Sequence, residues 1–70
     1  MAEPVYKLIE LVGTSPDSIS DAIENAVDRA AHTLRNLKWF EVTQIRGSLE
    51  SGTIKDYQVS LKAGFMLEGE

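Results

Sequence analysis

The 70-residue chain contains no cysteine, so neither disulfide bonds nor thiolate metal sites can stabilise it. Its single histidine, His32, has no second histidine with which to hold a structural zinc ion. A chain of this length buries only about 60% of the surface that it exposes when unfolded. Small domains that lack disulfide bonds and structural metal ions commonly gain stability by associating with further copies. We therefore expect one domain, residues 1–70, that forms an oligomer.

Basic clusters and long apolar runs are also missing. Seven Lys and Arg residues are outnumbered by eleven Asp and Glu residues, which gives a formal charge of −4. Because nucleic-acid binding depends on basic patches, we predict no nucleic-acid partner. The longest apolar run, residues 8–12, is interrupted by Glu10 and is far shorter than a membrane span. Residues 1–4 lack the features of a signal peptide, so we expect a cytoplasmic protein without membrane association.

The hydrophobic pattern divides the chain into four segments. Residues 5–12 are rich in β-branched and aromatic side chains and predict a strand. A helix is predicted from about 16 to 36, with Ser15 as N-cap and Pro16 at the first helical position. Its apolar positions recur every three or four residues: Ile19, Ala22, Ile23, Ala26, Val27, Ala30, Leu34 and Leu37. The three alanines predict that the helix lies close to a sheet.

From Trp39 the pattern alternates, which predicts a second strand, a turn at residues 50–53 and a third strand at about 54–68. The third strand is longer than most, so it should bend or pair with two neighbours. Residues 68–70 are predicted to be a frayed tail. The fold class is therefore α+β with the order β-α-β-β, a three-stranded antiparallel sheet with one helix packed on one face.

The other face of this sheet is free within one chain to meet a second subunit, a ligand or both. Strict alternation in the second strand puts Gln44 and Arg46 on the face opposite to that of Trp39. In the third strand, Gln58 lies on the face that also carries the polar residues Ser60 and Lys62.

Catalytic chemistry is poorly supported by these residues. No cysteine can act as a nucleophile, and His32 falls within the predicted helix. Residues 13–15 lack the glycine-rich length and the lysine of a phosphate-binding loop, so helix capping is the better interpretation. Trp39 and Gln58 instead offer a stacking surface and an amide with both a donor and an acceptor, which suit a planar heteroaromatic ligand. Each residue also has a simpler interpretation, as packing for Trp39 and as a solvated strand residue for Gln58.

Four stretches of the chain resemble the dodecin family, small flavin-binding proteins of bacteria and archaea. The stretches are Val5-Tyr6-Lys7…Glu10-Leu11-Val12-Gly13-Thr14-Ser15, Trp39-Phe40-Glu41-Val42, Ile45-Arg46-Gly47 and Tyr57-Gln58-Val59. The resemblance covers nearly the whole chain and extends to its length and segment order. The spacing of nineteen residues between Trp39 and Gln58 fits the family's pair of ligand-contacting residues.

The resemblance implies a hollow homododecamer that stores flavins, in pairs at two-fold interfaces, without turning them over. By this resemblance Trp39 stacks on the isoalloxazine ring and Gln58 bonds its pyrimidine edge. Arg46 resembles the arginine that bacterial members carry near the flavin, which favours FMN over riboflavin. Gln44 stands where relatives tend to carry an acid, which leaves its contact with the ribityl hydroxyls in question. Bacterial members are also associated with coenzyme A on the assembly.

Other interpretations remain open at this stage. In the first, the protein is a structural or protein-interaction module in which Trp39 anchors an interface without a ligand. In the second, Arg46 and Gln44 are ordinary polar groups of a sheet face. An enzyme that uses bound flavin is disfavoured, because a ring between two indoles has little room beside it for a substrate.

Overall fold

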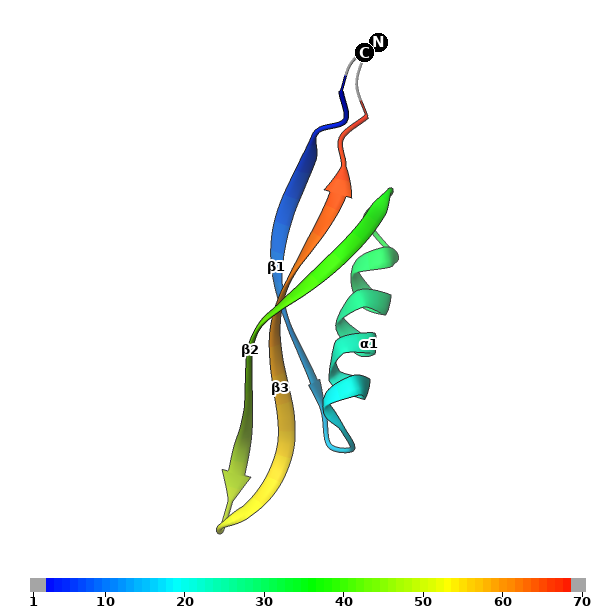
Figure 1. The fold of residues 1–70 in the computed structure, drawn as a ribbon. Coiled ribbons are helices and arrows are strands. Elements are labelled where there is room, and N and C mark those ends of the chain that lie inside the picture. The colour runs from blue at the N-terminus through cyan, green and yellow to red at the C-terminus, as the bar shows by residue number, and fades with distance from the viewer. Residues whose placement is uncertain (1–2, 69–70) are drawn as a thin grey trace.

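The computed structural model describes residues 3–68, and their elements follow in the order β1 (Tyr6–Ser15), α1 (Ile19–Ala31), β2 (Leu37–Glu50) and β3 (Thr53–Met66). The three strands form one antiparallel sheet, and α1 lies along one side of it (Figure 1). The predicted β-α-β-β fold is therefore confirmed. Residues 1, 2, 69 and 70, which belong to the predicted single domain, lie outside the described part of the chain.

The strand order is β1-β3-β2, so the last strand occupies the centre of the sheet. This 14-residue strand pairs with β2 along most of its length and with β1 over residues 57–66, which confirms the expectation that so long an alternating segment pairs with two neighbours. A tight turn joins β2 to β3, with Ser51 and Gly52 at φ angles of 51° and 78°. Positive φ at both central positions is typical of the hairpin turns that match the twist of antiparallel strands.

The helix is shorter than predicted, and its N-cap is Ser18 rather than Ser15. The amide of Asp21 donates to Ser18 Oγ at 3.0 Å, which satisfies one of the first free N–H groups of the helix. Ser15 is instead the last residue of β1 and is buried. Its Oγ accepts a 3.0 Å hydrogen bond from the amide of Asp17 and so stabilises the turn that carries Pro16.

At its other end α1 stops at Ala31, and His32 is the C-cap rather than a residue of the helix. Asn36 adopts a φ of 66°, a conformation that Asn tolerates better than most residues, and the chain enters β2 at once. Leu37 consequently belongs to β2, although its spacing fits the helix.

The core lies between α1 and the neighbouring face of β1 and β3. Ala22 and Ala26 pack against Val59 and Leu61, and all four are buried. A Cβ atom added to Gly13 would lie 2.0 Å from the carbonyl oxygen of Ala22. The predicted close approach of helix and sheet is therefore confirmed, and it depends on alanines on one side and glycine on the other.

The sheet side opposite α1, here called the open face, is not covered within the chain. Residues paired across strands share a face, which assigns to the open face Tyr6, Leu8, Glu10, Val12 and Thr14 of β1, Trp39, Glu41, Gln44, Arg46 and Ser48 of β2, and Asp56, Gln58, Ser60, Lys62, Gly64 and Met66 of β3. Several large apolar side chains of this face are exposed, among them Tyr6, Leu8, Val12 and Trp39.

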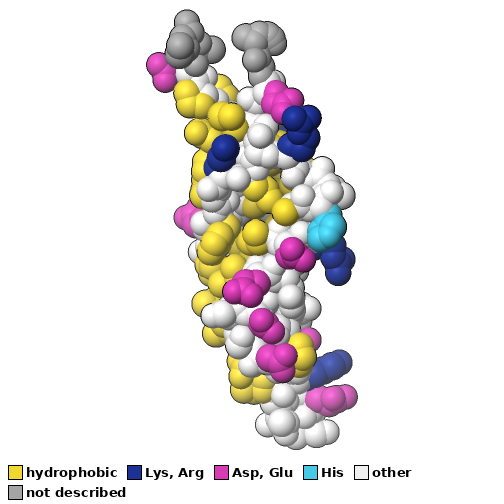
Figure 2. Space-filling view, turned by 90° about the vertical axis from the view of Figure 1, so that its right-hand side faces the viewer, with side chains coloured by type: hydrophobic (Ala, Val, Ile, Leu, Met, Phe, Trp, Pro, Cys, Tyr) yellow, Lys and Arg dark blue, Asp and Glu magenta, His cyan; other side chains and the backbone are white. Residues whose placement is uncertain are grey.

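The described chain is long and thin, with extents of 56 × 20 × 13 Å and a radius of gyration of 14.7 Å. A compact chain of this length has a radius of gyration of about 11 Å. Hydrophobic side chains also remain visible beside the helix, on the side of the molecule shown in Figure 2. Apolar surface is thus left on both sides of the sheet, as expected for a chain that completes its burial with further copies.

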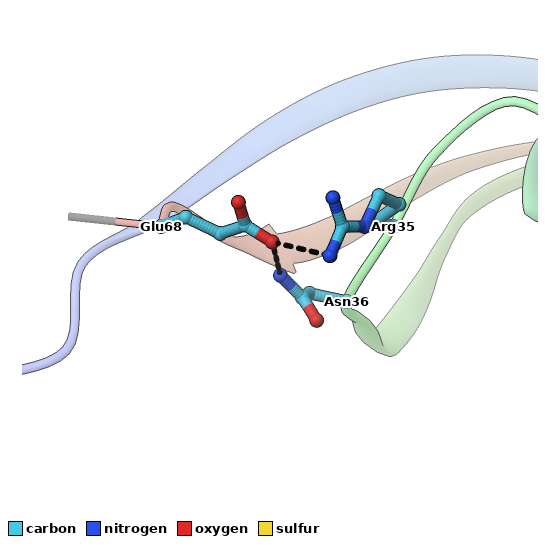
Figure 3. A network of polar contacts seen from close by, with 3 residues as sticks. All are labelled: Arg35, Asn36 and Glu68. Atoms are coloured by element: carbon cyan, nitrogen blue, oxygen red, sulfur yellow. Dashed lines mark hydrogen bonds and ion pairs between the residues drawn. The ribbon is translucent and has the colours of Figure 1, made fainter.

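Glu68, the last described residue, is held by two polar contacts, although residues 68–70 are predicted to be a frayed tail. The carboxylate of Glu68 lies 3.0 Å from Arg35 Nη2, and Asn36 Nδ2 donates to the same oxygen at 3.2 Å (Figure 3). The prediction of fraying is therefore wrong for Glu68. For Gly69 and Glu70 it lies outside the described residues.

Candidate functional site

Trp39 lies on the open face at a place where no side chain stands beneath it. It is the cross-strand partner of Gly64, and a Cβ atom added there would lie 2.5 Å from two carbon atoms of the indole. On the far side of β3, the ring of Tyr6 meets the indole edge-on, with ring centroids 4.8 Å apart. Trp39 as a whole is nevertheless 42% exposed. Its position is thus fixed by neighbours while surface remains available for stacking.

Further along the open face, Arg46 organises a polar network with three partners. Its Nε donates to Gln58 Oε1 at 2.9 Å, and its Nη1 donates to Gln44 Oε1 at 3.0 Å and to Ser60 Oγ at 2.9 Å. The strand pairing explains this arrangement, because Arg46 is opposite Gln58 and Gln44 is opposite Ser60. Three of the four predicted site residues therefore lie together.

The acceptors in this network are all neutral. Within residues 3–68, the one ion pair is that of Arg35 with Glu68, at the other end of the sheet. The next acid along this face, Asp56, accepts a hydrogen bond from Ser48 instead. Arg46 is thus held in place with its positive charge unpaired, and its third nitrogen, Nη2, makes none of these three bonds.

Trp39 shares the open face with this network but lies well apart from it. The positions opposite Trp39 and Arg46 in β3 are Gly64 and Gln58, six residues apart. At about 3.3 Å per residue the separation is about 20 Å. A single planar ligand does not span this distance, so within one chain the two parts of the predicted site are not brought together.

The predicted face of Trp39 relative to Gln44 and Arg46 is wrong. The pairing of β2 with β3 is irregular between Val42 and Gln44, where Thr43 has no partner. An extra residue in one strand shifts all following side chains to the other face. The bulge at Thr43 therefore turns Gln44 and Arg46 onto the face that carries Trp39.

Three residues of this surface were not predicted as part of the site: Tyr6, Ser60 and Gly64. The sequence does contain a feature that could identify Gly64, because a glycine within a strand often marks the close approach of another group. Tyr6 and Ser60 enter only through pairing across the sheet, which the order of the strands determines. A groove of about 700 Å³ between α1 and Phe40 is lined by none of the four predicted residues.

Comparison with known proteins places this geometry in a family. The Dodecin family model matches residues 5–68. This chain belongs to the dodecin family. It is 53% identical over 64 residues to the dodecin of Thermus thermophilus, covering 91% of this chain and 93% of that one. The solved structure of the Streptomyces coelicolor dodecin covers all of both chains at 53% identity, with a TM-score of 0.93.

Dodecins are generally small binding proteins without enzymatic activity, they bind flavins or related ligands, and they assemble with copies of themselves. A more distant relative, from Mycobacterium tuberculosis, is named a calcium dodecin, and its structure is described as having a calcium-binding site. The two chains are 31% identical, and their structures match over 94% of each chain with a TM-score of 0.81. In this dodecin, residues 3–68 contain no group of three or more His, Asp or Glu side chains placed to hold a metal ion. The same residues include no helix long and apolar enough to cross a membrane.

Proposed function

We propose that this dodecin is a non-enzymatic store for flavin, FMN above all, that works as a hollow homododecamer. The observation that carries the proposal is the composition of the open face. It presents a fixed, partly exposed indole at Trp39 and, on the same side of the sheet, a network of two amides around an unpaired guanidinium. These groups match the flat ring, the polar edge and the phosphate of FMN.

Each residue has a role that follows from its chemistry. Trp39 stacks on the isoalloxazine ring, since aromatic faces prefer offset stacking. Gln58 bonds the pyrimidine edge; its oxygen accepts from Arg46, and its amide nitrogen is left to donate to a ring carbonyl. Arg46 lies near the phosphate, and Gln44 meets the ribityl hydroxyls through its amide. Riboflavin, which lacks the phosphate, is the weaker ligand in this proposal.

The separation of Trp39 from Gln58 supports a site shared between chains. Because about 20 Å of strand lies between them, one ring meets the indole of one chain and the amide of another. A two-fold axis near Trp39 would bring two indoles face to face with the flavins between them. The thin shape of the chain and its exposed apolar residues support an assembly of this kind.

The proposed role in the cell is to sequester flavin and protect against its photochemistry. Bound flavin becomes a strong oxidant when it absorbs light. The indole of Trp39 transfers an electron to the excited flavin, and the electron then returns to the indole. Neither group is changed overall, and the excitation energy is lost as heat. This cycle needs direct contact between the rings, which stacking provides. Coenzyme A binding and a cytoplasmic location remain predictions, and we assign no residue to coenzyme A.

The alternative is a structural module in which Trp39 joins chains and no ligand binds. A fluorescence titration of FMN with the purified protein, combined with size-exclusion chromatography and light scattering, separates the two functions. We expect quenching that saturates near one flavin per chain, on a particle of about twelve chains. A particle of that size without quenching would favour the structural module. A monomer or dimer without quenching would contradict both the assembly and the ligand.

A further inference from the structure

We infer that Gln44 sets the ligand preference of this face, because it holds Arg46 in place without neutralising it and so leaves the charge for a phosphorylated ligand. The inference rests on the proposed flavin site and deepens it by naming a residue that determines specificity. Gln44 contacts the guanidinium and needs no contact with the flavin ring for this role.

Arg46 has N–H donors that its neighbours on the sheet do not use. A guanidinium offers five N–H donors, and Arg46 uses three of them for Gln58, Gln44 and Ser60. The two N–H groups of Nη2 take part in none of these bonds. Since Nε and Nη1 are anchored, the plane of the guanidinium is fixed and Nη2 is left to a ligand. Phosphate oxygens are strong acceptors for such a donor.

The positive charge of Arg46 is not neutralised by the groups that hold it. The acceptors around Arg46 are two amide oxygens and one hydroxyl, so none of them cancels its charge. A carboxylate at position 44 would accept the same 3.0 Å bond and pair with Arg46 within the chain. It would also repel a phosphate bound to Nη2. A ligand with the same rings but no phosphate would not be repelled. A carboxylate at position 44 should therefore lower the affinity for the phosphorylated ligand relative to the affinity for the neutral one.

The test compares FMN with riboflavin, which share the ring and differ in the phosphate. Dissociation constants for both are measured by fluorescence quenching for the unaltered protein and for Gln44→Glu. We expect the preference for FMN over riboflavin to fall roughly tenfold in the variant, as for like charges separated by several ångströms near a protein surface. Any change in contact with the ribityl hydroxyls, which both ligands carry, affects the two affinities alike and cancels in their ratio. A steep loss of the preference with added salt in the unaltered protein is expected for the same reason.

Two further variants separate charge from other effects. Gln44→Leu removes the hydrogen bond without adding charge and should keep most of the preference for FMN. Thr33→Glu adds the same charge at an exposed residue after α1 and should leave the ratio unchanged. Light scattering verifies that each variant assembles as the unaltered protein does.

The outcomes distinguish this inference from the proposed function. If Gln44→Glu binds both flavins with the original ratio, or if Thr33→Glu lowers the ratio equally, Gln44 does not set the preference and the inference fails while flavin binding stands. If the unaltered protein quenches neither flavin, the proposed function fails and the inference fails with it.

Discussion

The indole of Trp39 rests on Gly64, so the substitution Gly64→Ala tests whether this placement governs ligand binding. The added Cβ would lie 2.5 Å from Cε2 and Cζ2 of the indole and 2.8 Å from Cη2. Carbon atoms pack at about 3.5–4.0 Å, so the ring must move by about 1 Å or more. The backbone at Gly64 accepts alanine, because its φ is not positive. Among the glycines of residues 3–68, a positive φ occurs at Gly52.

The cost of this movement should appear in binding rather than in stability. Trp39 is 42% exposed, so its ring has room to turn toward solvent. The loss in free energy of unfolding should therefore be smaller than that of overpacking a closed core, which is about 1–3 kcal/mol. Loss of an aromatic stacking surface costs about 1–3 kcal/mol per stacked ring. The dissociation constant for FMN should therefore rise about 5- to 150-fold.

The assay combines ligand titration with the emission of the protein itself. Trp39 is the single tryptophan of the chain, so a red shift of its emission in Gly64→Ala would report the displacement directly. Gly47→Ala is the matched control, because its Cβ would meet only the carbonyl oxygen of Asp56, at 3.2 Å. Displaced emission with an unchanged FMN affinity, on particles of unchanged size, would refute the argument that the placement of Trp39 limits binding.

Four other substitutions test the site and the fold. Trp39→Ala should weaken FMN binding and restore flavin fluorescence with the particle intact by light scattering; dissociation of the particle would identify Trp39 as packing instead. Gln58→Ala should weaken FMN binding by about 0.5–1.5 kcal/mol in the same titration, as for one neutral hydrogen bond, and an unchanged affinity would contradict its role. Gly13→Ala should separate α1 from the sheet and lower the free energy of unfolding in urea by at least about 1–3 kcal/mol, since its Cβ would lie 2.0 Å from a backbone oxygen. Ser18→Ala should cost about 1 kcal/mol in the same assay, because it removes the N-cap, and Ser15 would be the true cap if it did not.

The strands and their order along the chain follow from local features of the sequence. Alternation predicts β3, and a turn rich in small and polar residues predicts the hairpin between β2 and β3. The alternating pattern puts Gln58, Ser60 and Lys62 on one face of β3, and Val59, Leu61 and Ala63, which alternate with them, are buried on the other. These features are local, because a strand with one covered face must place its apolar residues at every second position.

The ends of the helix depend on tertiary structure and were predicted less well. Ser15 and Ser18 both have the chemistry of an N-cap. Ser15 loses that role because its pairing with Tyr57 keeps it in β1. At the other end, Leu34 and Leu37 continue the helical spacing, but Asn36 turns the chain and Leu37 pairs with Phe65 of β3. Sheet pairing outweighs helical periodicity at both ends.

The resemblance names the residues of the proposed site, but it does not give their arrangement on the sheet. Trp39, Gln44, Arg46 and Gln58 are named by the resemblance, whereas strict alternation places Gln44 and Arg46 on the face opposite to that of Trp39, which is wrong. No glycine or proline marks the bulge at Thr43, so the local sequence gives no reason to interrupt the alternation. The bulge is visible only in the pairing with β3.

The separation of Trp39 from Gln58 links the ligand to the assembly. Both residues face the same side, yet about 20 Å of strand separates them. In one chain alone, a flavin ring can therefore contact the stacking surface or the polar groups, but not both. A ligand that needs both binds the assembled state and not the separate chains. Such a ligand stabilises the assembly by mass action, by about 2.7 kcal/mol when its free concentration is a hundred times the dissociation constant. Under the proposed function, a small chain without disulfides would gain its missing stability and its binding site from the same event, because the open face left unburied in one chain is the face that carries the proposed site.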